Sequence, residues 1–140
     1  MKKYISEDTL WEIAAMGLGL IVGIAIISIM IQINYMFYPA DDLFVNGTSS
    51  DFVTEYFSNP PFLIGQIVSV LTGTFFSAAI AKLVKHELTF WNAIIIGTVL
   101  MLVGLLDIFS SPYPLYIKLI IPIIYIPAAL LGFQFIKNIQ

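Results

Sequence analysis

The sequence predicts an all-α membrane protein, a four-transmembrane-helix bundle with a short amphipathic helix in the first outer loop. The 140 residues are 59% hydrophobic and only 11% charged, whereas soluble domains average about 25% charged residues. A bilayer core of roughly 30 Å needs about 20 apolar residues per helix. Four stretches have that length: residues 13–33, 62–81, 90–109 and 115–136. They occupy most of the chain, so residues 1–140 are interpreted as one four-helix domain.

The first apolar stretch, residues 13–33, follows two lysines, as a signal peptide would. It is too long for the apolar part of a signal peptide, and no small-x-small cleavage site precedes Tyr35. We therefore expect a retained first helix. Within it, Gly19 and Gly23 stand four residues apart, a spacing that lets a second helix approach closely.

The second stretch, residues 62–81, carries a small residue at every fourth position. The five are Gly65, Ser69, Gly73, Ser77 and Ala81. Residues four apart share one face of a helix. Lipid provides no hydrophobic drive between helices, so a face of small residues favours packing by letting backbones approach. We expect this small-residue stripe to pack within the chain's own bundle.

The last two stretches, residues 90–109 and 115–136, are separated by a short connection and are expected to be antiparallel neighbours. The third helix repeats the small-residue spacing. The fourth contains Pro122 and Pro127, and each proline removes a backbone donor and favours a bend.

Lysines and aromatic residues predict the orientation. Only Lys118 lies near one end of the four helices. The other five lysines fall at the opposite end: Lys2, Lys3, Lys82, Lys85 and Lys137. The positive-inside rule then puts both termini in the cytoplasm and residues 34–61 outside. Aromatic residues suited to an interface fall at the predicted outer end: Tyr35, Tyr38, Tyr113 and Tyr116.

Within the outer loop, residues 50–57 have the pattern of a short amphipathic helix. The side chains of Phe52, Val53, Tyr56 and Phe57 would share one side, with Asp51 and Glu55 on another. Such a helix would lie on the outer membrane surface or over the mouth of the bundle. Whether it acts as a lid or as an interfacial anchor is left open.

Five polar residues in the outer half form the candidate site: Asp107, Lys118, Gln32, Asn34 and Gln66. Ionisable groups inside a membrane are expensive and point to function, here to a proton- or ion-linked site. In the structural alternative, Lys118 extends to headgroups and Asp107 to water, or the two pair. The three amides suit a water-filled vestibule or interhelical hydrogen bonds equally. We favour the structural alternative, because neither charge lies near the bilayer centre.

Several function classes find no support in the sequence. The chain has no cysteine and one histidine, His86, and a metal site needs several converging ligands. A net charge of −3 without a basic patch argues against nucleic-acid binding. No nucleotide-binding or nucleophile motif is present. We therefore expect no catalytic residues, no cofactor and no metal.

Several short segments together resemble an uncharacterised family of small four-helix bacterial inner-membrane proteins. These segments are Tyr35-Met36-Phe37-Tyr38-Pro39, Asn59-Pro60-Pro61, the run from Gly73 to Lys82, Ser111-Pro112-Tyr113-Pro114-Leu115-Tyr116 and Pro127-Ala128-Ala129-Leu130-Leu131-Gly132. The resemblance covers most of the chain. It implies the fold and a location in the bacterial inner membrane, and it implies no biochemical activity.

The expected function is therefore a non-enzymatic role in helix packing or as the subunit of a membrane complex. The alternative is a small transporter or proton-coupled permease, which would act as a homodimer because four short helices enclose little volume. The expected partners are the lipid bilayer and a second copy or a membrane-complex partner.

Overall fold

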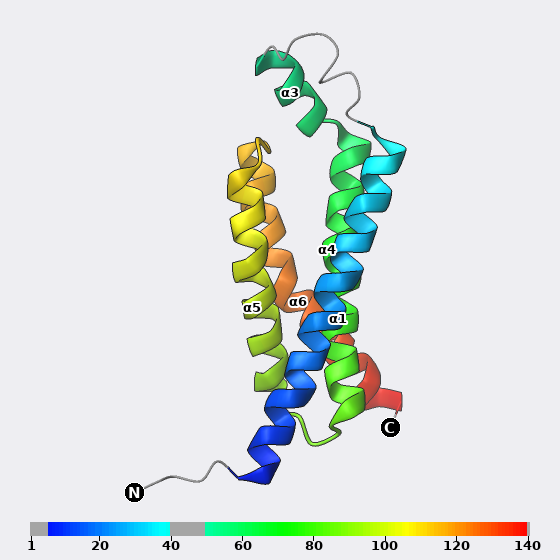
Figure 1. Ribbon diagram of the computed structural model, residues 1–140, viewed down its shortest axis with the longest axis vertical. Helices are drawn as coiled ribbons and strands as arrows, with labels where there is room; N and C mark the ends of the chain where they lie inside the picture. Colours follow the sequence, from blue (N-terminus) through cyan, green and yellow to red (C-terminus); the bar gives the residue numbers. More distant parts are fainter. Residues whose placement is uncertain (1–5, 40–49, 140) are drawn as a thin grey trace, which may run out of the picture.

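The computed structural model describes residues 6–39 and 50–139, and these ranges contain helices and no strand (Figure 1). The helices are α1 (Glu7–Phe37), α3 (Ser50–Phe57), α4 (Pro60–Val84), α5 (Phe90–Ser110) and α6 (Leu115–Ile139). All except α3 are long and apolar enough to cross a membrane.

Helix α1 begins before and ends after the predicted stretch 13–33. At its start Ser6 is the N-cap, and its side chain accepts a hydrogen bond from the backbone N–H of Thr9. The apolar pattern does not include this cap, so the predicted helix began several residues after the observed one. At the other end Tyr38 precedes Pro39, a position that disfavours helical backbone. The helix therefore runs to Phe37, into the segment predicted to be outer loop.

The other long helices also extend beyond their apolar cores. Helix α4 begins with Pro60 and Pro61 in its first turn, where a missing N–H breaks no helical bond. Both Pro122 and Pro127 lie inside α6, which is continuous from Leu115 to Ile139.

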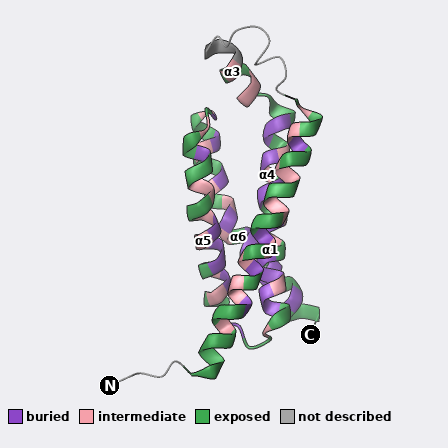
Figure 2. Ribbon diagram, viewed as in Figure 1, coloured by how far each residue is buried: buried purple, intermediate pink, exposed green. Residues whose placement is uncertain are grey.

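The four long helices pack in the order α1, α4, α6, α5. Helix α1 contacts α4 extensively, α4 contacts α6, and α6 contacts α5, while α1 and α5 meet only sparsely. Figure 1 shows the two resulting pairs, α1 with α4 and α5 with α6. Buried residues line the surfaces between the helices, and the outward surfaces are exposed (Figure 2). The side between α1 and α5 is therefore the loosely closed one.

The α1–α4 contact is made by small residues on both helices. A Cβ on Gly19 would collide with the carbonyl oxygen of Ser77, and one on Gly23 would meet the Ser77 side chain. A Cβ on Gly73 would meet Ile27 of α1. Ser69 and Ala81 are also buried. Most of the small-residue stripe thus lies where the two backbones approach each other.

At the end of the molecule that holds both described termini, Lys82 closes the turn between α4 and α5. Its ammonium donates to the carbonyl oxygens of His86 and Leu88 and lies 4.9 Å from the centre of the Phe133 ring. This buried lysine therefore satisfies two backbone carbonyls of the turn, which lie outside both helices.

Candidate functional site

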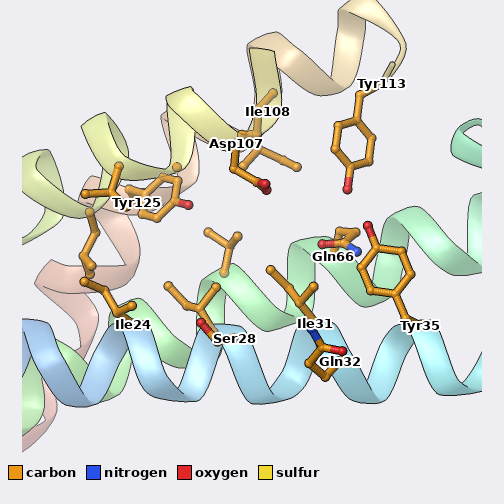
Figure 3. Close-up of a pocket in the computed structure, with 16 residues that line it drawn as sticks. Ile24, Ser28, Ile31, Gln32, Tyr35, Gln66, Asp107, Ile108, Tyr113 and Tyr125 are labelled. Carbon is orange, nitrogen blue, oxygen red and sulfur yellow. The ribbon is translucent and has the colours of Figure 1, made fainter. Parts of the chain in front are cut away.

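A cavity of about 360 Å³ lies between α1, α4, α5 and α6, in the half of the molecule nearer α3. Its volume is within the range of small-molecule sites, about 300–1,000 Å³. The lining is apolar apart from seven residues (Figure 3): Ser28, Gln32, Tyr35, Gln66, Asp107, Tyr113 and Tyr125.

Gln66 is the buried amide of this cavity. It lies on α4, it is 3% exposed, and its Nε2 has no hydrogen-bond partner among the described residues. A buried donor without a partner costs about 1–3 kcal/mol. The Gln66 side chain lines the cavity, and its Nε2 is itself buried.

Asp107 brings a negative charge to the same space. Its carboxylate points from α5 into the cavity (Figure 3), and it interacts electrostatically with Tyr35, Tyr113 and Tyr125. Close packing of α5 on α6 sets this geometry, because Gly104 leaves room for the ring of Tyr125. Three tyrosines of the cavity wall thus lie within electrostatic reach of the carboxylate.

Two hydroxyls meet at the outer end of the cavity. Tyr35 of α1 and Tyr113 of the α5–α6 hairpin point toward each other (Figure 3). Burial, together with nearby Tyr35 and Asp107, raises the pKa of Tyr113 well above its usual value of 10.0. Tyr113 therefore remains protonated at neutral pH, able to donate a hydrogen bond.

The cavity opens between α1 and α5. Several lining residues of these two helices are exposed, including Ser28 of α1 and Asp107 of α5. Lining residues of α4 and α6, including Gln66 and Tyr125, are buried and form the rear wall. The opening coincides with the sparse contact between α1 and α5.

Aromatic rings cover the outer end of the cavity. We call these rings the aromatic cap: Tyr35, Tyr38, Tyr56, Phe57, Phe62 and Tyr113. Phe62 is fully buried at its centre. The ring centroid of Phe57 in α3 lies 5.1 Å from that of Tyr113 and 5.8 Å from that of Phe62. The Tyr56 hydroxyl donates to the carbonyl of Tyr38. Helix α3 is thereby attached to α1, α4 and the hairpin.

The structure separates the five residues of the predicted polar cluster. Gln32, Gln66 and Asp107 line the cavity. Asn34 is instead buried between α1 and α4, where its Nδ2 donates to the carbonyl oxygen of Phe62 at 2.9 Å, and its carboxamide fills the space beside Gly65.

Lys118 also lies away from the cavity. Its ammonium sits 5.9 Å from the centre of the Phe109 ring. The ion pairs among the described residues join Lys85 to Asp8 and Glu87, and none joins Lys118 to Asp107. The α5–α6 hairpin therefore does not place Lys118 on the face where Asp107 lines the cavity.

Sequence reasoning assigned the tyrosines of the cavity to other roles or passed over them. Tyr35 and Tyr113 were predicted to be interfacial aromatics, and Tyr125 was not singled out. A signal was present for Tyr125, because a hydroxyl near the middle of a 25-residue apolar helix needs a partner or a cavity.

Comparison of the chain with protein-family models, with curated proteins and with solved structures finds no match. Within the described ranges, no three histidine, aspartate or glutamate side chains converge as metal ligands would. The chemistry of the cavity is therefore argued from its own lining: one carboxylate, carboxamides and tyrosine hydroxyls.

Proposed function

We propose that this is a multi-pass protein of a bacterial inner (plasma) membrane, with both termini cytoplasmic and residues 34–61 outside. Four apolar helices of sufficient length support the membrane location. Lys82 and Lys85 lie at the end where α1 begins and α6 ends, which supports the orientation. In this arrangement the long helices form a four-helix transmembrane bundle, and α3 is an amphipathic helix at the outer surface.

The absence of cysteine from the chain gives a direct test of this orientation. Single cysteines are introduced as Ser6→Cys, before α1, and Asn59→Cys, between α3 and α4. In intact cells a membrane-impermeant maleimide should label Asn59→Cys, and it should label Ser6→Cys only after permeabilisation. The opposite pattern, or labelling of both in intact cells, contradicts the proposed orientation.

We further propose that the protein has a non-enzymatic role and binds a ligand in the cavity, in the outer half of the bilayer. The observation that carries this proposal is the cavity of about 360 Å³ itself. One of its lining residues, Gln66, has a buried Nε2 without a partner among the described residues. The charge of Asp107 in the same cavity supports it, because a charge at this depth is costly unless something pairs with it.

Obstruction of the opening tests this proposal. Ser28→Trp puts a large side chain at the opening, and Ile21→Trp puts the same side chain at an exposed position of α1 that does not line the cavity. After purification in a mild detergent, native mass spectrometry should find a bound molecule on the wild type and on Ile21→Trp, and not on Ser28→Trp. A ligand-free wild type, or equal occupancy of the two variants, contradicts the proposal.

A ligand-binding membrane protein of this kind could be a transporter or a subunit of a complex, and the two differ in oligomeric state. A small homodimeric transporter or proton-coupled permease is favoured by the ionisable Asp107 in the cavity. A subunit of a membrane complex is favoured by α1, because its spanning segment is only 17% buried and leaves an apolar face for lipid or a partner. The mass of the detergent-solubilised particle separates them: a homodimer supports transport, a hetero-complex supports a subunit role, and a partner-free monomer contradicts both.

A further inference from the structure

The composition of the cavity wall specifies a ligand chemistry, and this inference rests on the proposed function that the cavity binds a ligand. We propose that the ligand is an amphiphile with a primary-amine headgroup and nearby oxygen acceptors, which enters from the bilayer between α1 and α5. Three features of the cavity favour such a ligand: the charge of the wall, its hydrogen-bonding side chains and the position of its opening.

The charge of the wall favours a cation. Asp107 is the charged residue of the lining, and none of the described lysines lines the cavity. The nearest candidate, Lys118, lies over Phe109 instead. An ammonium would pair with the Asp107 carboxylate in a charge-assisted hydrogen bond.

The hydrogen-bond donors favour an oxygen close to that cation. Gln66 and Tyr113 both line the cavity, and a carboxamide N–H and a phenol O–H can each donate to an oxygen. Tyr113 lies beside Asp107, and Gln66 comes from the facing helix α4 (Figure 3). The wall thus has an acceptor on α5 and donor-bearing side chains on α4 and the hairpin. An ammonium joined by a short linker to a phosphate or ester matches this order.

The position of the opening favours entry from the lipid. The aromatic cap covers the end that would face outer water, with Phe62 fully buried at its centre. The open side lies between α1 and α5, beside exposed apolar side chains such as Ile24 and Val103. In the proposed arrangement this side faces acyl chains. A volume of about 360 Å³ accommodates a headgroup while its chains stay in the bilayer.

The test compares three probes on purified protein in detergent: phosphatidylethanolamine, phosphatidylglycerol and free ethanolamine. Phosphatidylethanolamine and free ethanolamine carry the amine. The two phospholipids carry phosphate and acyl chains. Binding is measured by titration, with native mass spectrometry reporting occupancy. Phosphatidylethanolamine should bind the wild type at least about tenfold more tightly than phosphatidylglycerol, since a hydrogen bond to a charged group contributes about 1.5–3 kcal/mol.

Three variants test whether the Asp107 carboxylate causes the preference for phosphatidylethanolamine. Asp107→Asn should lose that preference, Asp107→Glu should retain much of it, and Glu55→Gln, which removes an exposed carboxylate of α3 outside the cavity, should leave it unchanged. Asp107 is exposed, so Asp107→Asn is expected to fold, and unchanged thermal unfolding of the ligand-free variant checks this. An Asp107→Asn variant with the full preference overturns the amine assignment.

The remaining outcomes separate this inference from the proposed function. If both lipids bind equally and Ser28→Trp abolishes this binding, the amine assignment is wrong. The cavity then remains a ligand-binding site. Free ethanolamine that binds as tightly as phosphatidylethanolamine identifies a soluble amine and overturns entry from the bilayer. Lipid binding that Ser28→Trp does not change contradicts the cavity as the site, and with it the proposed function.

Discussion

Two carboxamides near the outer end of α1 and α4 have opposite effects on stability in this fold. The Asn34 amide is satisfied, because its Nδ2 donates to Phe62 across the α1–α4 contact. The Gln66 amide is buried with an Nε2 that has no partner among the described residues. Similar side chains thus have a satisfied donor at one position and an unsatisfied buried donor at the other, and the atoms of the neighbouring helix make the difference.

This contrast predicts changes of opposite sign in the free energy of unfolding. Asn34→Ala should lower it by about 1 kcal/mol, since interhelical hydrogen bonds in membrane proteins have roughly this strength. Gln66→Met should leave the ligand-free protein as stable or more stable, by up to about 1 kcal/mol, because an unsatisfied buried donor is removed. Unfolding titrations with a denaturing detergent measure both. A Gln66→Met variant destabilised as much as Asn34→Ala would mean that the Gln66 amide is a structural hydrogen-bond donor.

Tyr113 predicts a loss of stability in base. Burial is the main reason that its pKa lies above the usual 10.0, so the folded protein holds the proton more tightly than the unfolded chain does. The stabilisation is fully present below pH 10 and is lost as the pH rises toward the folded-state pKa. Thermal unfolding in detergent should therefore shift to lower temperature above about pH 10. Tyr113→Phe should reduce this shift, and an identical pH dependence of the variant would contradict the assignment.

At the scale of elements, the contact between α1 and α4 depends on glycines that have no space for a side chain. A Cβ on Gly73 meets Ile27 and the backbone of Gly23. Gly73→Leu should therefore destabilise the monomer by about 1–3 kcal/mol, the usual range for overpacking. Gly17 of α1 is the matched control, since a Cβ there meets nothing within 4 Å.

The readout for this pair is the unfolding titration together with the mass of the folded particle. Gly17→Leu should be neutral or slightly stabilising, because glycine is a poor helix former. If Gly73→Leu left the monomer equally stable and only dissociated oligomers, the small-residue stripe would serve an interface between copies instead.

The sequence made some features of these elements predictable and concealed others. Hydropathy identified the four long apolar helices, but it missed the Ser6 cap and the stop at Tyr38–Pro39, which are local hydrogen-bonding and steric effects. Four-residue spacing indicated a packing face on α4 without naming α1 as its partner. The sequence placed Gln66 and Asp107 in the outer half. Their meeting with Tyr125 depends on how α4, α5 and α6 pack together, and no single helix encodes that.

At the scale of the whole molecule, the two ends of the bundle are closed differently. At the end with the termini, Lys82 bonds the turn between α4 and α5. At the other end, closure depends on rings of the aromatic cap, with Phe57 of α3 resting on Phe62 and Tyr113. A short helix joined to the bundle by such contacts can be released at low cost, because each aromatic pair contributes only about 0.5–1.5 kcal/mol beyond its buried area.

The aromatic cap therefore predicts that Phe57 controls the access of water-soluble reagents to the cavity. With Ser28→Cys as the only cysteine, a small hydrophilic maleimide added to intact cells should react slowly, since the cap covers the outer end and lipid covers the side. Phe57→Ala should accelerate this labelling by about tenfold or more, the factor that about 1.4 kcal/mol of lost ring contact provides. Glu55→Ala, an exposed change on the same helix, should not accelerate it. Equal labelling rates with and without Phe57 would mean that α3 is an interfacial anchor and not a barrier to the cavity.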